Sequence, residues 1–135
     1  MHDEHNGLAP IPAEVNEIGR MVMDAAFAVH RELGPGLLET VYEHCLAQDL
    51  LQAGLLVERQ VGVPITYRDS QLDAGFRLDL LVERKVVVEV TSIDALASIH
   101  TAQVLTYLKF SQIRLGYLIN FNTLRLKDGF RRLVL

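Results

Sequence analysis

Apolar residues recur at every third or fourth position in the first part of the chain. Between residues 14 and 33 this spacing, which includes Ile18, Val22 and Val29, predicts an amphipathic helix. The Gly-Pro-Gly sequence at residues 34–36 ends that helix. A second stretch with helical spacing begins at residue 37 or 38 and continues to about residue 53, so two helices are expected before the pattern changes.

From residue 55 onward, β-branched and apolar residues dominate. Residues 56–59 and 61–67 predict two strand segments or one bent strand. Residues 72–82 and 86–91 predict two further strands, and the polar interval Glu83-Arg84-Lys85 between them fits a hairpin connection. A β-hairpin centred near residue 84 is therefore expected.

Helical spacing returns over residues 99–108, followed by a short apolar run over 113–120 and a candidate final strand over 130–135. The order helix, helix, strands, helix, strand, strand predicts an α/β fold in which helices flank a mixed central β-sheet. The third helix connects the strand that ends at Thr91 to the strand that begins at Ile113. These two strands should therefore be parallel neighbours.

The composition fits one domain in a reducing compartment. Half of the 135 residues are apolar, which is ample for one continuous core, so we expect residues 14–135 to form a single domain. Residues 1–13 contain two acidic residues and neither Lys nor Arg, which predicts a flexible leader. No apolar stretch approaches the roughly 20 residues that span a bilayer. Cys45 is the only cysteine, so we expect a cytoplasmic protein without a membrane partner.

Charge is unevenly distributed along the chain. The formal net charge of −4 argues against a strongly basic nucleic-acid-binding protein, yet residues 109–135 carry six cations against one acid. Two interpretations stay open for this segment. Either it forms a basic surface that contacts phosphates, or its cations are ordinary solvated charges beside strands.

The predicted hairpin carries two carboxylates, Asp79 and Glu89, on its neighbouring strands. If the hairpin is centred on Arg84, Asp79 faces Glu89 and Arg77 faces Thr91. Side chains that face each other across a ladder lie about 4.5–5.5 Å apart at Cβ, so two like charges there are destabilising unless something neutralises them. A divalent cation such as Mg²⁺ or Mn²⁺, which prefers oxygen ligands, would do so.

A structural interpretation competes with the metal site. The hairpin face could be exposed to solvent, with Arg77 forming ion pairs with both acids. Against this stands the run from Val86 to Val90, whose apolar residues on both faces are typical of a covered central strand. An ionised Glu89 in such a strand needs a partner. Both interpretations stay open, because a register shift of one residue would break the pairing.

Four blocks of the sequence resemble one known family. Residues 36–42, Gly-Leu-Leu-Glu-Thr-Val-Tyr, match the motif that names the GxxExxY proteins. Residues 77–82, 99–103 and 118–122 are similar to that family's other blocks, and the resemblance covers residues 14–135. The family is considered part of the PD-(D/E)XK nuclease-like superfamily. The resemblance therefore implies a restriction-endonuclease-like core.

The resemblance also implies roles for individual residues. The active centre of the superfamily has an Asp on one strand, a Glu-x-Lys on the next and a helical Glu upstream, which correspond here to Asp79, Glu89 and Glu39. Gln103 and Tyr107 resemble the Gln-x-x-x-Tyr signature of recombination-type exonucleases in the superfamily. The implied cofactor is Mg²⁺ or Mn²⁺, held by the three acids.

Helical spacing adds His100 to the face that carries Gln103 and Tyr107. Each of these helical residues also has a plain structural interpretation. Tyr107 could be a core aromatic residue and His100 a residue that starts a helix. On the upstream helix, Glu39 could be solvated together with Tyr42 and Glu43.

Thr91 departs from the superfamily pattern, because it stands where the resemblance places the lysine of Glu-x-Lys. A threonine hydroxyl is uncharged and is not a practical base at neutral pH, so it can replace neither function of that lysine. Arg77 could stabilise phosphate charge, but its pKa above 12 prevents it from acting as a base. Weak or absent cleavage is therefore expected.

Three functions stay open at this point. The first is a weak or degenerate Mg²⁺-dependent phosphodiesterase acting on nucleic acid, and the second is a catalytically inactive nuclease-like module that binds nucleic acid or a protein partner. The third is a structural protein or a homo-oligomer in which the acids form only ion pairs. The candidate substrate-binding residues are Arg77 and His100. The candidate catalytic residues are Glu39, Asp79, Glu89, Thr91, Gln103 and Tyr107, of which Asp79, Glu89 and Glu39 are the candidate metal ligands.

Overall fold

The computed structural model describes residues 9–135, and its element order is the predicted one. The elements are α1 (Ala13–Leu33), α2 (Glu39–Gln52), β1 (Val57–Tyr67), β2 (Ser70–Val82), β3 (Val86–Thr91), α3 (Ser98–Ser111), β4 (Leu115–Asn120), the 3₁₀ helix η2 (Leu126–Gly129) and β5 (Phe130–Val134). Most of the predicted leader lies outside the described residues. Within its described part, Ile11 is buried against the core.

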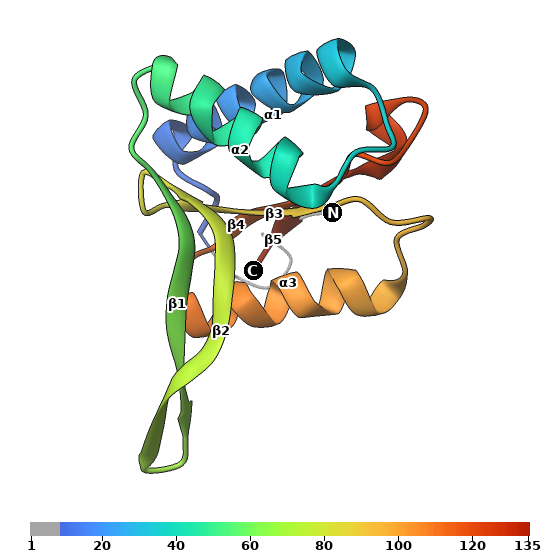
Figure 1. Ribbon diagram of the computed structural model, residues 1–135. Helices are drawn as coiled ribbons and strands as arrows, with labels where there is room; N and C mark the ends of the chain where they lie inside the picture. Colours follow the sequence, from blue (N-terminus) through green and yellow to red (C-terminus); the bar gives the residue numbers. More distant parts are fainter. Residues whose placement is uncertain (1–8) are drawn as a thin grey trace.

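The five strands form one mixed sheet with the order β1-β2-β3-β4-β5. All neighbouring pairs are antiparallel except β3 and β4, which are parallel and are connected by α3. Helices α1 and α2 cover one face of the sheet and α3 covers the other (Figure 1). The predicted α/β architecture and the predicted parallel pair are therefore confirmed. None of the described helices is both long and apolar enough to cross a membrane.

Strand β3 is covered on both faces, as its apolar sequence predicts. Val86, Val88 and Val90 pack into the core beneath α1 and α2, whereas Val87 packs into the core beneath α3. Because side chains alternate along a strand, Glu89 lies on the same side as Val87, toward α3. The two-sided burial explains why an acid in this strand needs a partner.

Strand β1 is one bent strand, which was one of the two predicted alternatives. Its ladder with β2 pairs Arg59 with Leu80 and Val61 with Leu78, but omits Gln60 between them. Gln60 has a left-handed backbone, with φ of 53°. This conformation interrupts the ladder at Gln60 without shifting its register, whereas the register shift that bends the strand lies between Val63 and Ile65.

Tyr42 fixes the loop between α1 and α2. Its fully buried ring stacks on Phe121 with the centroids 4.5 Å apart. Its hydroxyl donates to the carbonyl of Gly34 at 2.6 Å and accepts the N–H of Leu37 at 3.1 Å. Gly36 adopts φ of 98°, which favours glycine. The glycine and tyrosine of the GxxExxY motif therefore shape the loop that leads into Glu39.

Removing the Tyr42 hydroxyl should destabilise the protein. We expect Tyr42→Phe to lower the free energy of unfolding by about 1–3 kcal/mol, because the part-buried carbonyl of Gly34 and N–H of Leu37 both lose their hydrogen-bond partner. Urea denaturation would measure this difference. Tyr67→Phe is the matched control, since Tyr67 is 59% exposed. Equal losses in the two variants would contradict a special role for the Tyr42 hydroxyl.

Candidate active site

All eight candidate residues from the sequence line one cavity of about 270 Å³. The cavity lies where β2, β3 and the start of α2 approach α3. A larger cavity of about 350 Å³ between β1 and the end of α3 has Arg84 as its single ionisable residue, so it offers no comparable chemistry. The lining of the smaller cavity is Glu39, Arg77, Asp79, Glu89, Val90, Thr91, His100, Gln103, Val104, Tyr107 and Leu118.

The predicted hairpin register is confirmed from Val82–Val86 to Leu80–Val88, where the ladder between β2 and β3 ends. The expected ladder pairs of Asp79 with Glu89 and of Arg77 with Thr91 are therefore wrong, although all four side chains do reach the same cavity. Just beyond this point, the N–H groups of Asp79 and Val90 donate to carboxylate oxygens.

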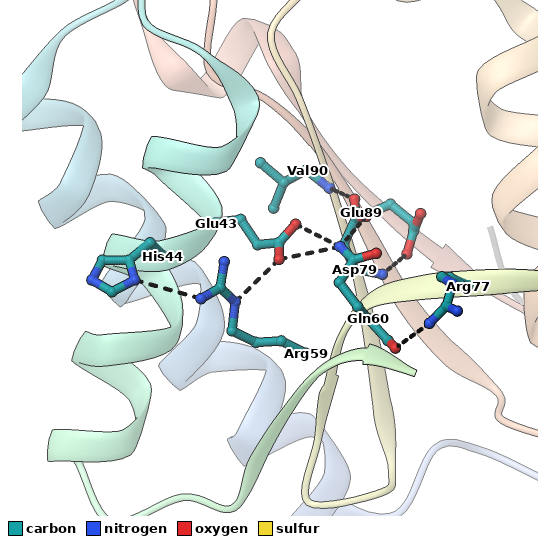
Figure 2. A network of polar contacts seen from close by, with 8 residues as sticks. All are labelled: Glu43, His44, Arg59, Gln60, Arg77, Asp79, Glu89 and Val90. Carbon is teal, nitrogen blue, oxygen red and sulfur yellow. Dashed lines mark hydrogen bonds and ion pairs between the residues drawn. The ribbon is translucent and has the colours of Figure 1, made fainter. Parts of the chain in front are cut away.

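Each of the two acids accepts a backbone N–H from the opposite strand (Figure 2). The N–H of Asp79 donates to Oε2 of Glu89 at 2.9 Å, and the N–H of Val90 donates to Oδ2 of Asp79 at 2.9 Å. Backbone donors satisfy buried carboxylate oxygens that would otherwise be costly. The two strands thus hold both carboxylates at the opening between them.

Burial and mutual repulsion raise the pKa of both acids. Burial is the larger cause for Glu89, and the charge of Asp79 adds to it, so the Glu89 pKa rises to about 9. Burial also raises the pKa of Asp79, and the N–H of Val90 offsets part of this effect. Without a cation, the site therefore keeps Glu89 protonated at neutral pH.

The donor set fits a hard divalent cation. Within the described part of the chain, no hydrogen-bond donor reaches Oε1 of Glu89, and the two acids supply oxygen ligands of the kind that Mg²⁺ and Mn²⁺ prefer. Three ligands are not assembled in advance, since residues 9–135 contain no group of three or more His, Cys, Asp or Glu placed to hold a metal. Glu39 is exposed and accepts the Thr91 hydroxyl at 3.3 Å.

Glu43 is an acid of the site that the sequence interpretation missed. It is 5% exposed and Tyr42 is fully buried, so the solvated helical side suggested for these two residues is wrong. Arg59 Nε donates to one Glu43 oxygen at 3.1 Å, and the Gln60 amide donates to both oxygens at 3.0 and 3.2 Å. A position one helical turn after Glu39 was the available signal.

His100, Gln103 and Tyr107 reach the cavity from one face of α3, as helical spacing predicts. His100 also has the helix-start role, because its Nδ1 accepts the N–H of Ala97 at 2.8 Å. A neutral imidazole with Nδ1 as acceptor carries its proton on Nε2. Tyr107 stacks on Phe76 at 4.2 Å, and burial followed by the Glu89 charge raises its pKa.

No lysine is among the residues that line this described cavity. Lys85 pairs with Glu14 at 3.4 Å, and Lys109 lies 5.3 Å from the ring of Phe110. Arg77 is the cation that lines the cavity, and its Nη1 donates to the carbonyl of Gln60 at 3.3 Å.

Asn120 fixes the chain just beyond Thr91. Its buried side chain accepts the N–H of Ile93 at 3.1 Å and donates to the Ile93 carbonyl at 3.0 Å. Thr91 is also the β-ladder partner of Asn120. Strand β4 therefore holds both the end of β3 and the loop that leads to α3.

The six C-terminal cations lie away from the candidate cavity, on several elements. Arg125 pairs with Asp128 at 3.7 Å, and Arg132 donates to Asn16 at 2.6 Å. These contacts agree with solvated charges for those two side chains. The other four cations are Lys109 on α3, Arg114 before β4, Lys127 in η2 and Arg131 on β5.

Comparison with known proteins bears on the whole of this arrangement. Residues 16–133 match the family model described as the PD-(D/E)XK nuclease superfamily. Comparisons with curated proteins and with solved structures gave no match. The matched region includes all eight candidate residues and the helices that cover the two faces of the sheet. The chain therefore belongs to the PD-(D/E)XK nuclease superfamily.

Proposed function

We infer that this protein is a weak metal-dependent phosphodiesterase that acts on nucleic acid. The observation that carries the proposal is the pair Asp79 and Glu89, held at an opening between two strands with raised pKa values. Two acids held this way gain most from a cation that neutralises them. The superfamily membership supports a nuclease-like reaction.

PD-(D/E)XK nucleases generally use divalent metal ions. In this chain Asp79 and Glu89 would hold Mg²⁺ or Mn²⁺, with Glu39 or Glu43 of α2 as a further oxygen donor. When bound, such an ion polarises a phosphoryl oxygen and lowers the pKa of a coordinated water. Ionised carboxylates are required for this, so metal binding would release the proton of Glu89.

The other cavity residues would bind and orient the phosphodiester. Arg77 and Nε2 of His100 offer hydrogen-bond donors to phosphate oxygens. Gln103 and Tyr107 share the α3 face and would position the substrate beside the acids. Thr91 offers neither a base nor a charge, so we expect slow cleavage.

A second candidate function is a nuclease-like module that binds nucleic acid or a protein partner without cleaving. The observation that favours it is the Thr91 hydroxyl, which is bonded to Glu39 and so already engages the helical acid. Binding to phosphates would weaken steeply with salt. Binding that does not respond to salt would indicate a protein partner.

Saturating Mg²⁺ or Mn²⁺ should stabilise the protein through Asp79 and Glu89. At a metal concentration 100 times the Kd, the expected gain is about 2.7 kcal/mol in the free energy of unfolding. Thermal denaturation at pH 8 with and without metal would measure it. Asp79→Asn and Glu89→Gln should lose the gain, whereas Asp73→Asn, an exposed acid of β2, should keep it.

The same variants separate the two candidate functions. Slow cleavage that the native chain and Asp73→Asn share, and that Asp79→Asn and Glu89→Gln lack, supports the phosphodiesterase. Metal stabilisation and salt-dependent binding without cleavage support the module. Absence of metal stabilisation in the native chain would contradict the phosphodiesterase and leave the acids with a structural role.

A further inference from the structure

Gln60 has an unusual backbone in the middle of a strand. Its φ of 53° is left-handed, and the β1–β2 ladder omits the pair that Gln60 would form with Asp79. A left-handed conformation is uncommon for residues other than glycine, asparagine and aspartate. Such strain persists where the surrounding structure enforces it, and it concentrates at functional sites.

The side-chain amide of Gln60 lies between two carboxylates. Its Nε2 lies 3.0 and 3.2 Å from the two oxygens of Glu43 and 3.3 Å from Oδ1 of Asp79 (Figure 2). Glu43 comes from α2 and Asp79 from β2, so this one side chain joins a helix to a strand. No other described side chain donates a hydrogen bond to both acids.

The backbone of Gln60 contributes a second contact. Its carbonyl accepts Nη1 of Arg77 at 3.3 Å, and Arg77 lines the candidate cavity. The same residue therefore contacts the acids through its side chain and the guanidinium of Arg77 through its main chain.

We propose that Gln60 is the positioning residue of the candidate metal site. It holds Asp79, through Oδ1, in the orientation that leaves this acid able to share a cation with Glu89, and it holds Glu43 beside them. The inference rests on the proposed function, because it concerns a cation at Asp79 and Glu89. It adds a residue outside the acids themselves that sets their affinity for the ion.

The chemistry of an amide suits this task. Glutamine donates two N–H groups without carrying charge, so it orients carboxylates and leaves their negative charge available to a cation. A lysine at this position would compete with the ion, and a carboxylate would repel both acids. Residues that orient metal ligands in this way typically change metal affinity 10–100-fold when they are replaced.

Two substitutions separate the amide from the backbone. Gln60→Asn keeps a residue that tolerates the left-handed conformation and keeps an amide, but the side chain is one methylene shorter. Gln60→Gly accepts the backbone and removes the amide. Arg68→Gly is the matched control, because Arg68 has φ of 54° in the β1–β2 turn and does not line the cavity.

The measurement is Mn²⁺ binding to the full chain by electron paramagnetic resonance, at a temperature well below each variant's Tm. We expect the Kd for Mn²⁺ to rise 10–100-fold in Gln60→Asn and Gln60→Gly and to stay unchanged in Arg68→Gly. A purely structural role would lower Tm in the two Gln60 variants without changing the Kd of the folded protein.

The remaining outcomes overturn the inference in distinguishable ways. If the native chain binds Mn²⁺ and both Gln60 variants bind it equally well or more tightly, the positioning role fails and the proposed function stands. If the native chain binds no Mn²⁺, the proposed function fails and the positioning role with it. If neither Gln60 variant folds while Arg68→Gly does, Gln60 is a structural residue.

Discussion

Thr91→Lys should raise metal-dependent cleavage of nucleic acid by about 10²–10⁴-fold over the native chain, because it restores a charge-stabilising group and a candidate base. Thr91 is the last residue of β3, two positions after Glu89, and it lines the cavity. Its ladder partner Asn120 is buried, so the backbone at this position is well held. A new side chain would start from a fixed point beside the acids.

Glu39 decides how much of this gain appears. It accepts the Thr91 hydroxyl at 3.3 Å, so a lysine amine at the same position would meet a carboxylate. An ion pair between them would hold the amine away from the phosphate. We therefore expect Thr91→Lys combined with Glu39→Gln to cleave faster than Thr91→Lys alone, when both variants are saturated with metal.

Thr91→Met is the matched control, because methionine has a similar length and no charge. Cleavage should be faster in Thr91→Lys, stay at the native level in Thr91→Met and vanish when Asp79→Asn is added to Thr91→Lys. A gel assay with a labelled oligonucleotide in Mg²⁺ or Mn²⁺ would measure it. If Thr91→Lys folds and binds metal yet cleaves no faster than the native chain, the hypothesis that Thr91 slows cleavage is wrong.

The strands and their order could be predicted because their signals are local. The bounds of β3 follow from an apolar run that only Glu89 interrupts, and the hairpin register follows from the short polar turn at Glu83 to Lys85. The parallel pairing of β3 with β4 follows from the handedness and reach of a helical crossover. Pattern and connection length were therefore sufficient for these features.

The grouping of the candidate residues depended on more than pattern. Periodicity placed Asp79 and Glu89 on one hairpin face, but the resemblance was needed to bring in Glu39 from the preceding helix. The structure joins them with Gln103 and Tyr107 around one cavity. Helical spacing alone identified only the shared face of α3.

Glu43 and Gln60 could not be found in the same way. The sequence of α2 does not distinguish an exposed Glu43 from a buried one. Glu43 is buried because β1 packs against α2. The left-handed backbone at Gln60 has no sequence signal, because the residue is neither a glycine nor an asparagine. The backbone donors that reach the carboxylates just beyond the end of the β2–β3 ladder likewise have no sequence signal. These are tertiary effects, which local propensity does not encode.

Stability without metal should fall as the pH rises from about 4.5 to 9, and Glu89 should be the main cause. Its pKa in the folded protein is about 9, raised from 4.5 mainly by burial and then by the charge of Asp79. Over this range the folded protein retains a proton that the unfolded chain has lost, so raising the pH favours unfolding. For one such group, the free energy of unfolding falls by about 4 kcal/mol between pH 5 and pH 8.

Glu89→Gln isolates this effect, because an amide keeps an oxygen for the N–H of Asp79 and does not ionise. We expect the variant to match the native chain near pH 5 and to exceed its free energy of unfolding at pH 8 by several kcal/mol. Asp79, whose pKa is also raised, and the nearby Glu43 and Glu39 add repulsion with the same sign. Urea denaturation at both pH values, in EDTA, would measure the difference.

Mg²⁺ at more than about 1,000 times its Kd, where binding contributes over about 4 kcal/mol, should reverse the order of the two proteins at pH 8. The native chain gains stability as the ion replaces the proton of Glu89, whereas Glu89→Gln has lost a charged ligand and gains little. The same acid then destabilises the metal-free fold and stabilises the metal-bound one, which is the behaviour of a binding site and not of a structural ion pair. A native chain whose stability is flat between pH 5 and pH 8, with or without Mg²⁺, would show that Glu89 is already ionised and satisfied by the protein alone.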